Sequence, residues 1–449
     1  MDSMDVLPAS LTVTVCGGGN GAHVAAGYLA SKPALKVNVL TRRPDEWSRS
    51  IKIVTKGSSW ESKGTINGTL HTVTDDPSAV IPDSDLVIVA APAHTHPPIL
   101  HKIAPHISRT RRTLLGALYA QGGFDWAARA AIGDLTRVEA LFGLQNIPWI
   151  CKKTVYGREA RILGPKKNLW VASCPVEKSR TVACLMSLLF DIPTGTVPNF
   201  LTLTLTPSNQ IIHPARYYGI FNEWDGRRVY GRDEIPWGLY SDMDDLSAMW
   251  LDRLDQELQA VKHRLLGHFP ALDLSLVLPL GERVIRQYGS DVSDRSSLKM
   301  IFVSNRGYQG CVTPTKCLHD GAGKVLGYLP DVDSRLFWED IPYGLCVLKG
   351  IAEMLGVSTP AVDAMIEWHQ KWMGKQFILG HKLNPATVKD TAAPPAYGMS
   401  SLVDLVSSSL PQHHQEQHTA VLQTRLSEGI GEGQAINGGV AAMSRLMRF

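Results

Sequence analysis

The chain has 449 residues, of which 44% are hydrophobic and 19% charged, and its formal net charge is +3. This length can bury more than one core, so two domains are expected. The charge is too small to indicate a polyanionic partner, so no nucleic-acid binding is expected. The seven cysteines are scattered without a Cys-x-x-Cys pair, which argues against a disulfide framework or a zinc ribbon.

The start of the chain and its hydropathy favour a cytoplasmic location. Residues 1–10 contain two acidic residues and no basic segment before an apolar run, so no signal peptide is expected. No apolar run approaches the length that crosses a bilayer. We therefore expect a cytoplasmic protein without a membrane partner.

A cluster of glycines lies near the start of the chain, between a strand pattern and a helix pattern. Gly17 and Gly19 occupy the first two positions of a Gly-x-Gly-x-x-Gly/Ala motif, where missing side chains permit a tight turn and the close approach of a pyrophosphate. Asn20 follows, and the small Ala22 allows the helix to pack on the sheet. The phosphates would lie at the helix N-terminus. These residues form the predicted dinucleotide site.

The order of elements around this loop supports that interpretation. A helix is expected at 23–31, and strand patterns lie at 11–16, 36–43, 84–93, 112–120 and 137–144. Strands that alternate with helices are typical of a doubly wound parallel sheet. Residues 11–195 are therefore predicted to form a Rossmann-type α/β domain.

Two arginines follow the second strand, where dehydrogenases selective for the unphosphorylated coenzyme usually carry an acid. Arg42 and Arg43 suit a 2′-phosphate, which favours NADPH. Asp45, slightly downstream, could instead accept from the ribose hydroxyls, and the arginines would then be a solvated basic pair. NADPH is the preferred coenzyme, with NADH as the alternative.

The pattern changes after about residue 195. Apolar residues at helical intervals in 247–266 and 341–357 predict an all-helical domain over 196–398, with the active site in the cleft between the two domains. Residues 399–449 begin with a polar segment and are predicted to be a C-terminal extension, either flexible or carrying a short docking helix.

Two segments of the second half carry residues suited to acid–base chemistry. His213 lies one helical turn after Asn209, and Arg335 lies five residues before Asp340. A histidine can titrate near neutral pH, a carboxylate can orient its ring, and an arginine can grip a carboxylate through two parallel bonds. Taken alone, these patterns are more typical of a capped helix and a surface ion pair.

A histidine-rich segment and an aromatic-rich segment have simpler interpretations. His94 and His96 have no acidic residue beside them, so no metal site is predicted. Four aromatic residues lie in a stretch rich in Gly and Asp that is typical of a loop, and they could shape a substrate pocket: Trp224, Tyr230, Trp237 and Tyr240.

Several separated blocks strengthen the functional interpretation: VCGGGNGAH, QGGFD, PWICK, NQIIHP, DRSSLKMIFVSNRGYQG, SRLFWEDIPYGL and MGKQF. Over about residues 13–398 the chain resembles the opine dehydrogenases, the octopine/nopaline dehydrogenase family. The resemblance implies a Rossmann domain, a helical domain like that of 6-phosphogluconate dehydrogenase, and NAD(P)H-dependent reductive condensation of a 2-oxo acid, commonly pyruvate, with an amino acid. The implied partners are these small molecules, and the oligomeric state stays open.

The resemblance also assigns roles by position. His213 matches the catalytic histidine of the family, Asp340 its acidic partner, and Arg335 a substrate-binding arginine beside that pair. Gln121 and Asn146 fall where the family lines the 2-oxo acid pocket, although Asn146 stands in place of a small hydroxyl residue. With Asn209, these are the predicted substrate-binding residues.

Two alternatives would use the same layout. Other two-domain NAD(P)-dependent 2-oxoacid or hydroxyacid reductases commonly use a lysine as the acid, and the His213 and Asp340 blocks do not fit them. A non-catalytic NADPH-sensing protein would need the glycine loop but not His213, Arg335 and Asp340 together. Oxidation of the coenzyme that depends on both a keto acid and an amine would separate these functions.

Overall fold

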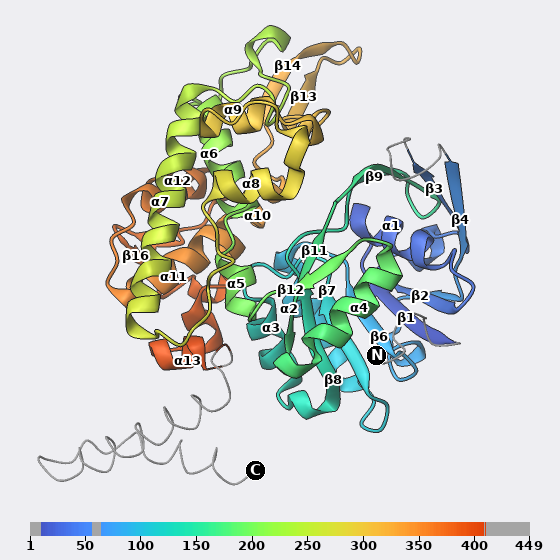
Figure 1. Ribbon diagram of the computed structural model, residues 1–449. Helices are drawn as coiled ribbons and strands as arrows, with labels where there is room; N and C mark the ends of the chain where they lie inside the picture. Colours follow the sequence, from blue (N-terminus) through green and yellow to red (C-terminus); the bar gives the residue numbers. More distant parts are fainter. Residues whose placement is uncertain (1–9, 56–63, 408, 410–449) are drawn as a thin grey trace, which may run out of the picture. The chain divides into compact units, whose positions relative to one another are not determined.

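The computed structural model describes residues 10–55, 64–407 and 409, and Figure 1 shows how its elements are arranged. An α/β part with a large sheet is followed by a mainly helical part. The predicted combination of a Rossmann-type domain and a helical domain is therefore confirmed. Within the described residues, no helix is long and apolar enough to cross a membrane.

The main sheet has eight strands and is parallel except where β11 pairs with β8. In spatial order the strands are β12 (Thr194–Thr196), β11 (Leu169–Cys174), β8 (Val138–Leu144), β7 (Thr113–Ala117), β6 (Leu86–Val89), β1 (Leu11–Cys16), β2 (Leu35–Leu40) and β5 (Thr72–Thr74). The order reverses at β1, which pairs with β6 on one side and β2 on the other. Open α/β sheets bind ligands at the carboxyl ends of strands beside such a reversal. The glycine loop follows β1 at this point.

Helices cover both faces of the main sheet, which explains the uninterrupted apolar sequence of β6. They are α1 (Asn20–Leu29), α2 (His96–Ile103), α3 (Phe124–Ile132) and α4 (Ser179–Phe190). Ile88 of β6 lies in the core that includes α1 and α4, whereas its neighbour Val89 lies in the core that includes α2 and α3. Successive side chains of a strand point to opposite faces, so each strand contributes to both cores.

A smaller sheet packs against α1. In spatial order its strands are β4 (Gly64–Thr69), β3 (Ser50–Thr55), β10 (Glu159–Pro165) and β9 (Trp149–Val155). Ile51 and Ile53 lie so close to Gly27 that a Cβ at Gly27 would stand 2.8 Å from each. The backbone N–H of Lys153 donates to Asn20 Oδ1 over 3.1 Å. This sheet therefore lies beside the start of α1.

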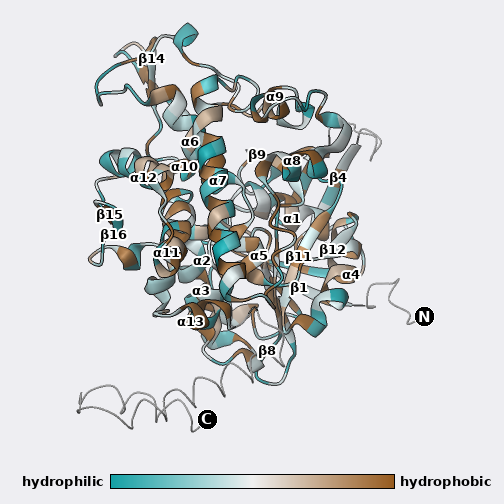
Figure 2. Cartoon of the chain, turned by 60° about the vertical axis from the view of Figure 1, so that its left-hand side comes forward, coloured by the Kyte–Doolittle hydropathy of each residue, from teal (hydrophilic) through white to brown (hydrophobic). Residues whose placement is uncertain are grey.

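The second part is built mainly from helices. They are α5 (Phe200–Leu205), α6 (Asn209–Phe221), α7 (Asp245–His268), α8 (Leu280–Tyr288), α9 (Leu298–Val303), α10 (Arg335–Trp338), α11 (Cys346–Leu355), α12 (Pro360–Met373) and α13 (Leu402–Val406). Two hairpins that the sequence did not predict accompany them, β13 (Thr315–His319) with β14 (Val325–Pro330) and β15 (Ile378–Leu379) with β16 (Lys382–Leu383). Figure 2 shows hydrophilic residues along one side of α7, while its Leu251, Leu254 and Leu258 are buried.

Arg216 fixes the position of α6. Its side chain is fully buried, and its guanidinium donates to the Leu239 carbonyl (2.7 Å) and to Ser247 Oγ (3.1 Å) and pairs with Asp244. Ser247 belongs to the first turn of α7. A buried charge that is paired and hydrogen-bonded in this way is costly to displace, so the middle of α6 is held firmly where it carries His213.

The described part of the chain ends just after a short helix, α13 (Leu402–Val406). Residues from 399 were expected to form an extension, but α13 lies among them, with Ser401 as its N-cap and with Leu405 and Val406 buried. The packed part of the chain therefore continues past residue 399. Residues 410–449, on which the predicted docking helix falls, lie outside the described residues.

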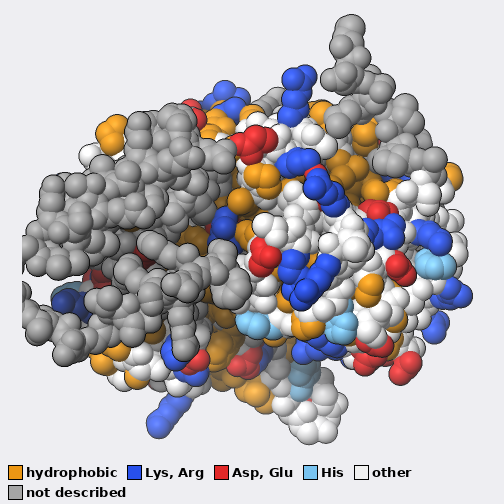
Figure 3. All heavy atoms as spheres, turned by 90° about the horizontal axis from the view of Figure 1, so that it is seen from below, with side chains coloured by type: hydrophobic (Ala, Val, Ile, Leu, Met, Phe, Trp, Pro, Cys, Tyr) orange, Lys and Arg blue, Asp and Glu red, His pale blue; other side chains and the backbone are white. Residues whose placement is uncertain are grey.

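Charged side chains of both signs lie on the surface. On the face drawn in Figure 3, lysine and arginine side chains lie among aspartate and glutamate side chains. This mixture agrees with the small net charge of +3.

Candidate active site

The glycine loop between β1 and α1 opens onto a cavity of about 440 Å³. Gly17 has a φ of +147°, and a Cβ there would lie 2.5 Å from the Ala90 carbonyl oxygen, so the turn requires glycine. Gly19 is the N-cap of α1, and nothing lies within 4 Å of the place where its Cβ would stand. Gly19 and Asn20 line the cavity, whereas Ala22 is buried beneath the loop. The free N–H groups of this helix terminus suit an anion.

A neutral histidine fixes the carbonyl side of this loop. The Gly157 N–H donates to His23 Nε2 over 2.7 Å, so His23 carries its proton on Nδ1, which donates to the Gly19 carbonyl over 2.8 Å. Burial lowers the pKa of His23 to about 4. The ring lies 4.2 Å from that of Trp47. The shape of the loop is therefore independent of pH near neutrality.

The two arginines after β2 are exposed. Arg43 packs on the ring of Tyr156, and the hydroxyl of Tyr156 lies beside Gly18 of the glycine loop. The guanidinium carbon of Arg43 lies 4.1 Å from the centre of the Tyr156 ring, and its Nη1 lies 3.2 Å from Glu46 Oε1. A Cβ at Gly18 would stand 2.9 Å from the Tyr156 hydroxyl. Arg42 and Asp45 are exposed on either side.

His213 and Asp340, which are far apart in the sequence, are hydrogen-bonded in the structure. His213 Nδ1 lies 2.7 Å from Asp340 Oδ2, and His213 is only 1% exposed. His213 Nε2 lies 2.6 Å from the hydroxyl of Tyr240. Burial raises the pKa of Tyr240 well above its ordinary value, so this hydroxyl stays protonated and donates to Nε2. The Nδ1 proton then points to Asp340, which fixes the tautomer.

Tyr240 separates His213 from the cavity. Tyr240 lines the cavity of about 440 Å³, and His213 is not among its lining residues. Trp224, Tyr230 and Trp237, the other aromatic candidates, do not line it either. In this conformation the hydroxyl of Tyr240 therefore connects the His213 imidazole to the cavity.

Arg335 lies at the start of α10 and lines the same cavity, and its side chain is about half exposed, at 53%. Its Nη1 lies 3.7 Å from Glu339 Oε2, and Glu339 Oε1 accepts the Ala93 N–H over 2.9 Å. Burial raises the pKa of Glu339 to about 7, a rise that Arg335 opposes and Asp340 increases. Glu339 thus links the helical part to the turn after β6.

The remaining predicted substrate residues lie at two neighbouring places. Asn146 and Asn209 line the larger cavity with Arg335. Gln121 lines a small cavity of about 20 Å³ next to Asp340, and its amide nitrogen donates to the Thr206 carbonyl over 3.1 Å while its oxygen accepts from Tyr119. Tyr119 lines both cavities, so Gln121 contacts the larger one through Tyr119.

His96 is the buried histidine of the histidine-rich segment. His96 Nε2 bonds to the Ala91 carbonyl over 2.9 Å, and burial lowers the pKa of His96 to about 4. The ring of His94 lies 6.3 Å from that of Tyr343. Among the residues that the structure describes, no group of three or more His, Cys, Asp or Glu side chains is placed to hold a metal ion.

Several cavity residues were missed from the sequence. Glu339 stands beside Asp340 in the chain, and this acidic pair was the signal that could have found it. Lys166 and Arg283 also line the cavity, but they come from segments far apart in the sequence and belong to no local pattern. Only the fold brings them together.

Comparisons with known proteins point to one family. Residues 196–373 match the family model described as NAD/NADP octopine/nopaline dehydrogenase, alpha-helical domain. The chain is 31% identical to an opine dehydrogenase of Haliotis discus hannai, covering 88% of this chain and 98% of that protein. It is 30% identical to a tauropine dehydrogenase of Arabella iricolor, over 87% and 99%. A solved octopine dehydrogenase in complex with NADH and agmatine matches with a TM-score of 0.77 and 27% identity, over 90% and 100%.

Proposed function

Because the chain belongs to the octopine/nopaline dehydrogenase family of NAD(P)-dependent oxidoreductases that act on CH–NH donors, we propose that it condenses pyruvate reductively with the amino group of an amino acid. The observation that carries this proposal is the hydrogen-bonded chain from Asp340 through His213 to Tyr240, which ends at a cavity shared by Arg335 and the glycine loop. The first part of the chain, 11–195, would hold the coenzyme, and 196–398 would hold the catalytic groups.

The residues of the glycine loop fit a nicotinamide dinucleotide. The backbone at Gly17 and the open N-cap at Gly19 leave a cradle at the helix N-terminus, and Lys153 adds a positive charge to the cavity. Gly19, Asn20 and Gly21 would hold the pyrophosphate. The bound coenzyme supplies the hydride for the reduction.

The condensation needs a group that both removes and returns protons. The amine nitrogen attacks the ketone carbon, water leaves, and the resulting imine takes up a hydride at carbon and a proton at nitrogen to give a secondary amine. His213 would accept the proton released by the attacking amine and return it to the departing hydroxyl, with Tyr240 carrying it between Nε2 and the cavity. Asp340 would stabilise the imidazolium that forms.

Arg335 would hold the 2-oxo acid. A guanidinium binds a carboxylate through two parallel charge-assisted bonds. Of the cations that line the cavity, Arg335 is the one closest to Asp340 in the sequence. Asn146 and Asn209 line the same cavity and could donate to the ketone oxygen.

We further propose that NADPH is the preferred coenzyme. Arg43 reaches toward the glycine loop through Tyr156, and no acid stands at the end of β2, where Thr41 is followed by Arg42 and Arg43. Glu46 pairs with Arg43, and this ion pair would have to break for Arg43 to bind a 2′-phosphate.

Identification of the product tests the proposed reaction. The enzyme, pyruvate, an amino acid and NADPH or NADH should yield a compound whose mass equals that of the two substrates, minus one water, plus two hydrogens. A lactate product with no incorporated amine would instead indicate a hydroxyacid reductase.

A further inference from the structure

Two cations on the cavity wall, Lys166 and Arg283, form no salt bridge with a described residue. Lys166 follows β10 and donates to the Tyr288 hydroxyl over 2.7 Å. Arg283 in α8 is only 7% exposed, and its Nη1 donates to Gln287 Oε1 over 2.8 Å. The buried Nε of Arg283 has no hydrogen-bond partner. In the described part of the chain, no carboxylate lies within 4.0 Å of either cation.

The tyrosine and the cysteine near Lys166 are neutral. Burial raises the pKa of Tyr288 to about 12 and also raises the pKa of the Cys311 thiol. Burial and the nearby charge of Arg283 lower the pKa of Lys166 to about 7. An enclosed cation without a counter-charge is costly, so a bound anion would relieve this site.

The rest of the cavity is also basic. Its described basic residues are Lys153, Lys166, Arg283 and Arg335, and its described acidic residue is Glu339. Glu339 lies beside Arg335. A cationic side chain of a substrate would therefore meet excess positive charge and no free carboxylate.

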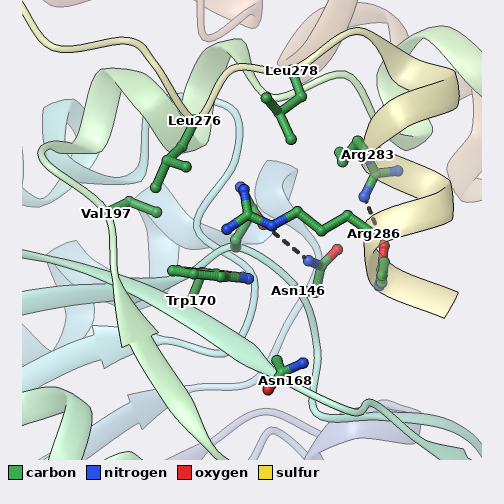
Figure 4. A pocket seen from close by; sticks show the side chains of 10 residues that line it. Asn146, Asn168, Trp170, Val197, Leu276, Leu278, Arg283 and Arg286 are labelled. Carbon is green, nitrogen blue, oxygen red and sulfur yellow. Dashed lines mark hydrogen bonds between the residues drawn. The ribbon is translucent and has the colours of Figure 1, made fainter. Parts of the chain in front are cut away.

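Arg283 stands between this cavity and a smaller one. Asn146, Arg283 and Gln287 line both. Figure 4 shows the smaller cavity. The drawn hydrogen bond of Arg283 goes to Gln287, one turn further along α8, and Arg286 lies beside Trp170. The guanidinium carbon of Arg286 lies 4.8 Å from the Trp170 ring centre, and Arg286 does not line the larger cavity.

We propose that Lys166 and Arg283 form an anion subsite for the amine substrate, and that this substrate is an amino acid with an acidic side chain. The inference rests on the proposed function, in which Arg335 takes the carboxylate of the 2-oxo acid. Two cations then remain for the two carboxylates of an aminodicarboxylate. The related octopine dehydrogenase, in contrast, was solved with L-arginine, whose side chain is cationic.

The test compares isosteric amines with the purified full chain. We expect kcat/KM at saturating pyruvate and coenzyme to be about tenfold to a hundredfold higher for glutamate than for glutamine, or for aspartate than for asparagine, because each charge-assisted bond contributes that much. Arginine should be the poorest of the five. This comparison needs no variant, so it does not depend on a mutant folding.

Two variants and a matched control locate the subsite. Arg283→Met and Lys166→Met should each reduce the preference for the acidic amine about tenfold, raise its dissociation constant by calorimetry, and leave the KM values of pyruvate and coenzyme within about twofold. Arg286→Met, on the same helix, should change none of these. Arg283→Lys keeps the charge and should retain part of the preference.

Each failure has a distinct meaning. If arginine or the neutral amides are used as well as the acidic amino acids, the subsite is wrong and the proposed reaction stands. If the two methionine variants raise the KM of the coenzyme or pyruvate instead, the cations serve another ligand and the inference is overturned. If no amine supports turnover with any 2-oxo acid, the proposed function fails and the subsite falls with it.

Discussion

Both ring nitrogens of His213 are engaged, one by Asp340 and one by Tyr240. We expect His213→Ala to lower kcat by about two to four orders of magnitude, because it removes the acid–base group, and to leave coenzyme affinity nearly unchanged. Asp340→Asn should lower kcat less than His213→Ala does. The double variant should be far from additive, since both residues act through one imidazole. Steady-state kinetics of the four proteins would check this, and losses that multiply independently would show that the two side chains do not cooperate.

Tyr240 offers a sharper test of the proton route, because its hydroxyl lies between His213 Nε2 and the cavity. Tyr240→Phe keeps the ring and removes only that hydroxyl. We expect kcat to fall about tenfold to a hundredfold while the KM of pyruvate changes little. Tyr308→Phe is the control, since its ring lies 4.5 Å from that of Tyr240 and also lines the cavity. Equal effects of the two substitutions would contradict a special role for the Tyr240 hydroxyl.

The choice of coenzyme is a further property of single residues. Arg43→Ala should raise the KM of NADPH about tenfold and leave that of NADH nearly unchanged, because charge-assisted bonds to a 2′-phosphate are worth roughly 1.5–3 kcal/mol. Arg42→Ala should have the smaller effect, since Arg43 is the one that contacts Tyr156. The double variant measures the combined effect of both arginines on the KM of NADPH. Equal changes for both coenzymes would show that these arginines do not read the phosphate.

At the scale of elements, Glu339 connects α10 to the turn that begins at Ala93. Its pKa is raised to about 7, mainly by burial, so the carboxyl is protonated below pH 7 and ionised above it. When ionised it partly offsets the charge of Arg335. We therefore expect the KM of pyruvate to rise as pH increases from 6 to 8, and Glu339→Gln to flatten this rise by about threefold or more while keeping an acceptor for Ala93.

The control for this prediction is the pH profile of kcat, which should keep its shape in Glu339→Gln. The free energy of unfolding should fall over the same rise in pH. A carboxyl whose folded pKa exceeds its unfolded value stabilises the fold fully below the unfolded pKa, and this contribution is lost as pH rises through about 7. If the KM of pyruvate rises equally with pH in the unmodified protein and in Glu339→Gln, the role assigned to Glu339 is contradicted.

Local patterns identified the elements that are proposed to hold the coenzyme. The strand, glycine loop, helix and strand around Gly17 lie close to where the sequence predicts them, because the turn requires glycine and the last four residues of each strand are buried. The long helix expected at 247–266 is α7. The hairpin β13–β14 was missed because its strands are largely exposed and lack alternating burial. α13 was missed because its five residues follow a polar stretch.

The site was predicted only in part, for a reason that lies in the fold. His213 and Asp340 were paired through resemblance to a family and not through spacing. The contact of Tyr240 with His213 depends on the loop between α6 and α7, and the approach of Lys166 to Tyr288 depends on how the segment after β10 meets α8. No periodicity in the sequence records such contacts, because they join segments that are distant in the chain.

In the whole molecule, one cavity connects the glycine loop with Arg335 and with the hydrogen-bonded chain of Asp340, His213 and Tyr240. The proposed reaction requires two organic substrates at once, a 2-oxo acid on Arg335 and an amine within reach of Tyr240. A cavity of about 440 Å³ that is lined by both parts of the chain provides the space for them.

The most direct measurement follows the absorbance of NADPH, and in parallel NADH, at neutral to alkaline pH across a matrix of 2-oxo acids and amino acids. We expect the coenzyme to be oxidised at a substantial rate only when a 2-oxo acid and an amino acid are both present, with the product containing both. Oxidation that proceeds equally well with the 2-oxo acid alone, or that never occurs although the coenzyme binds, would contradict the proposed reaction.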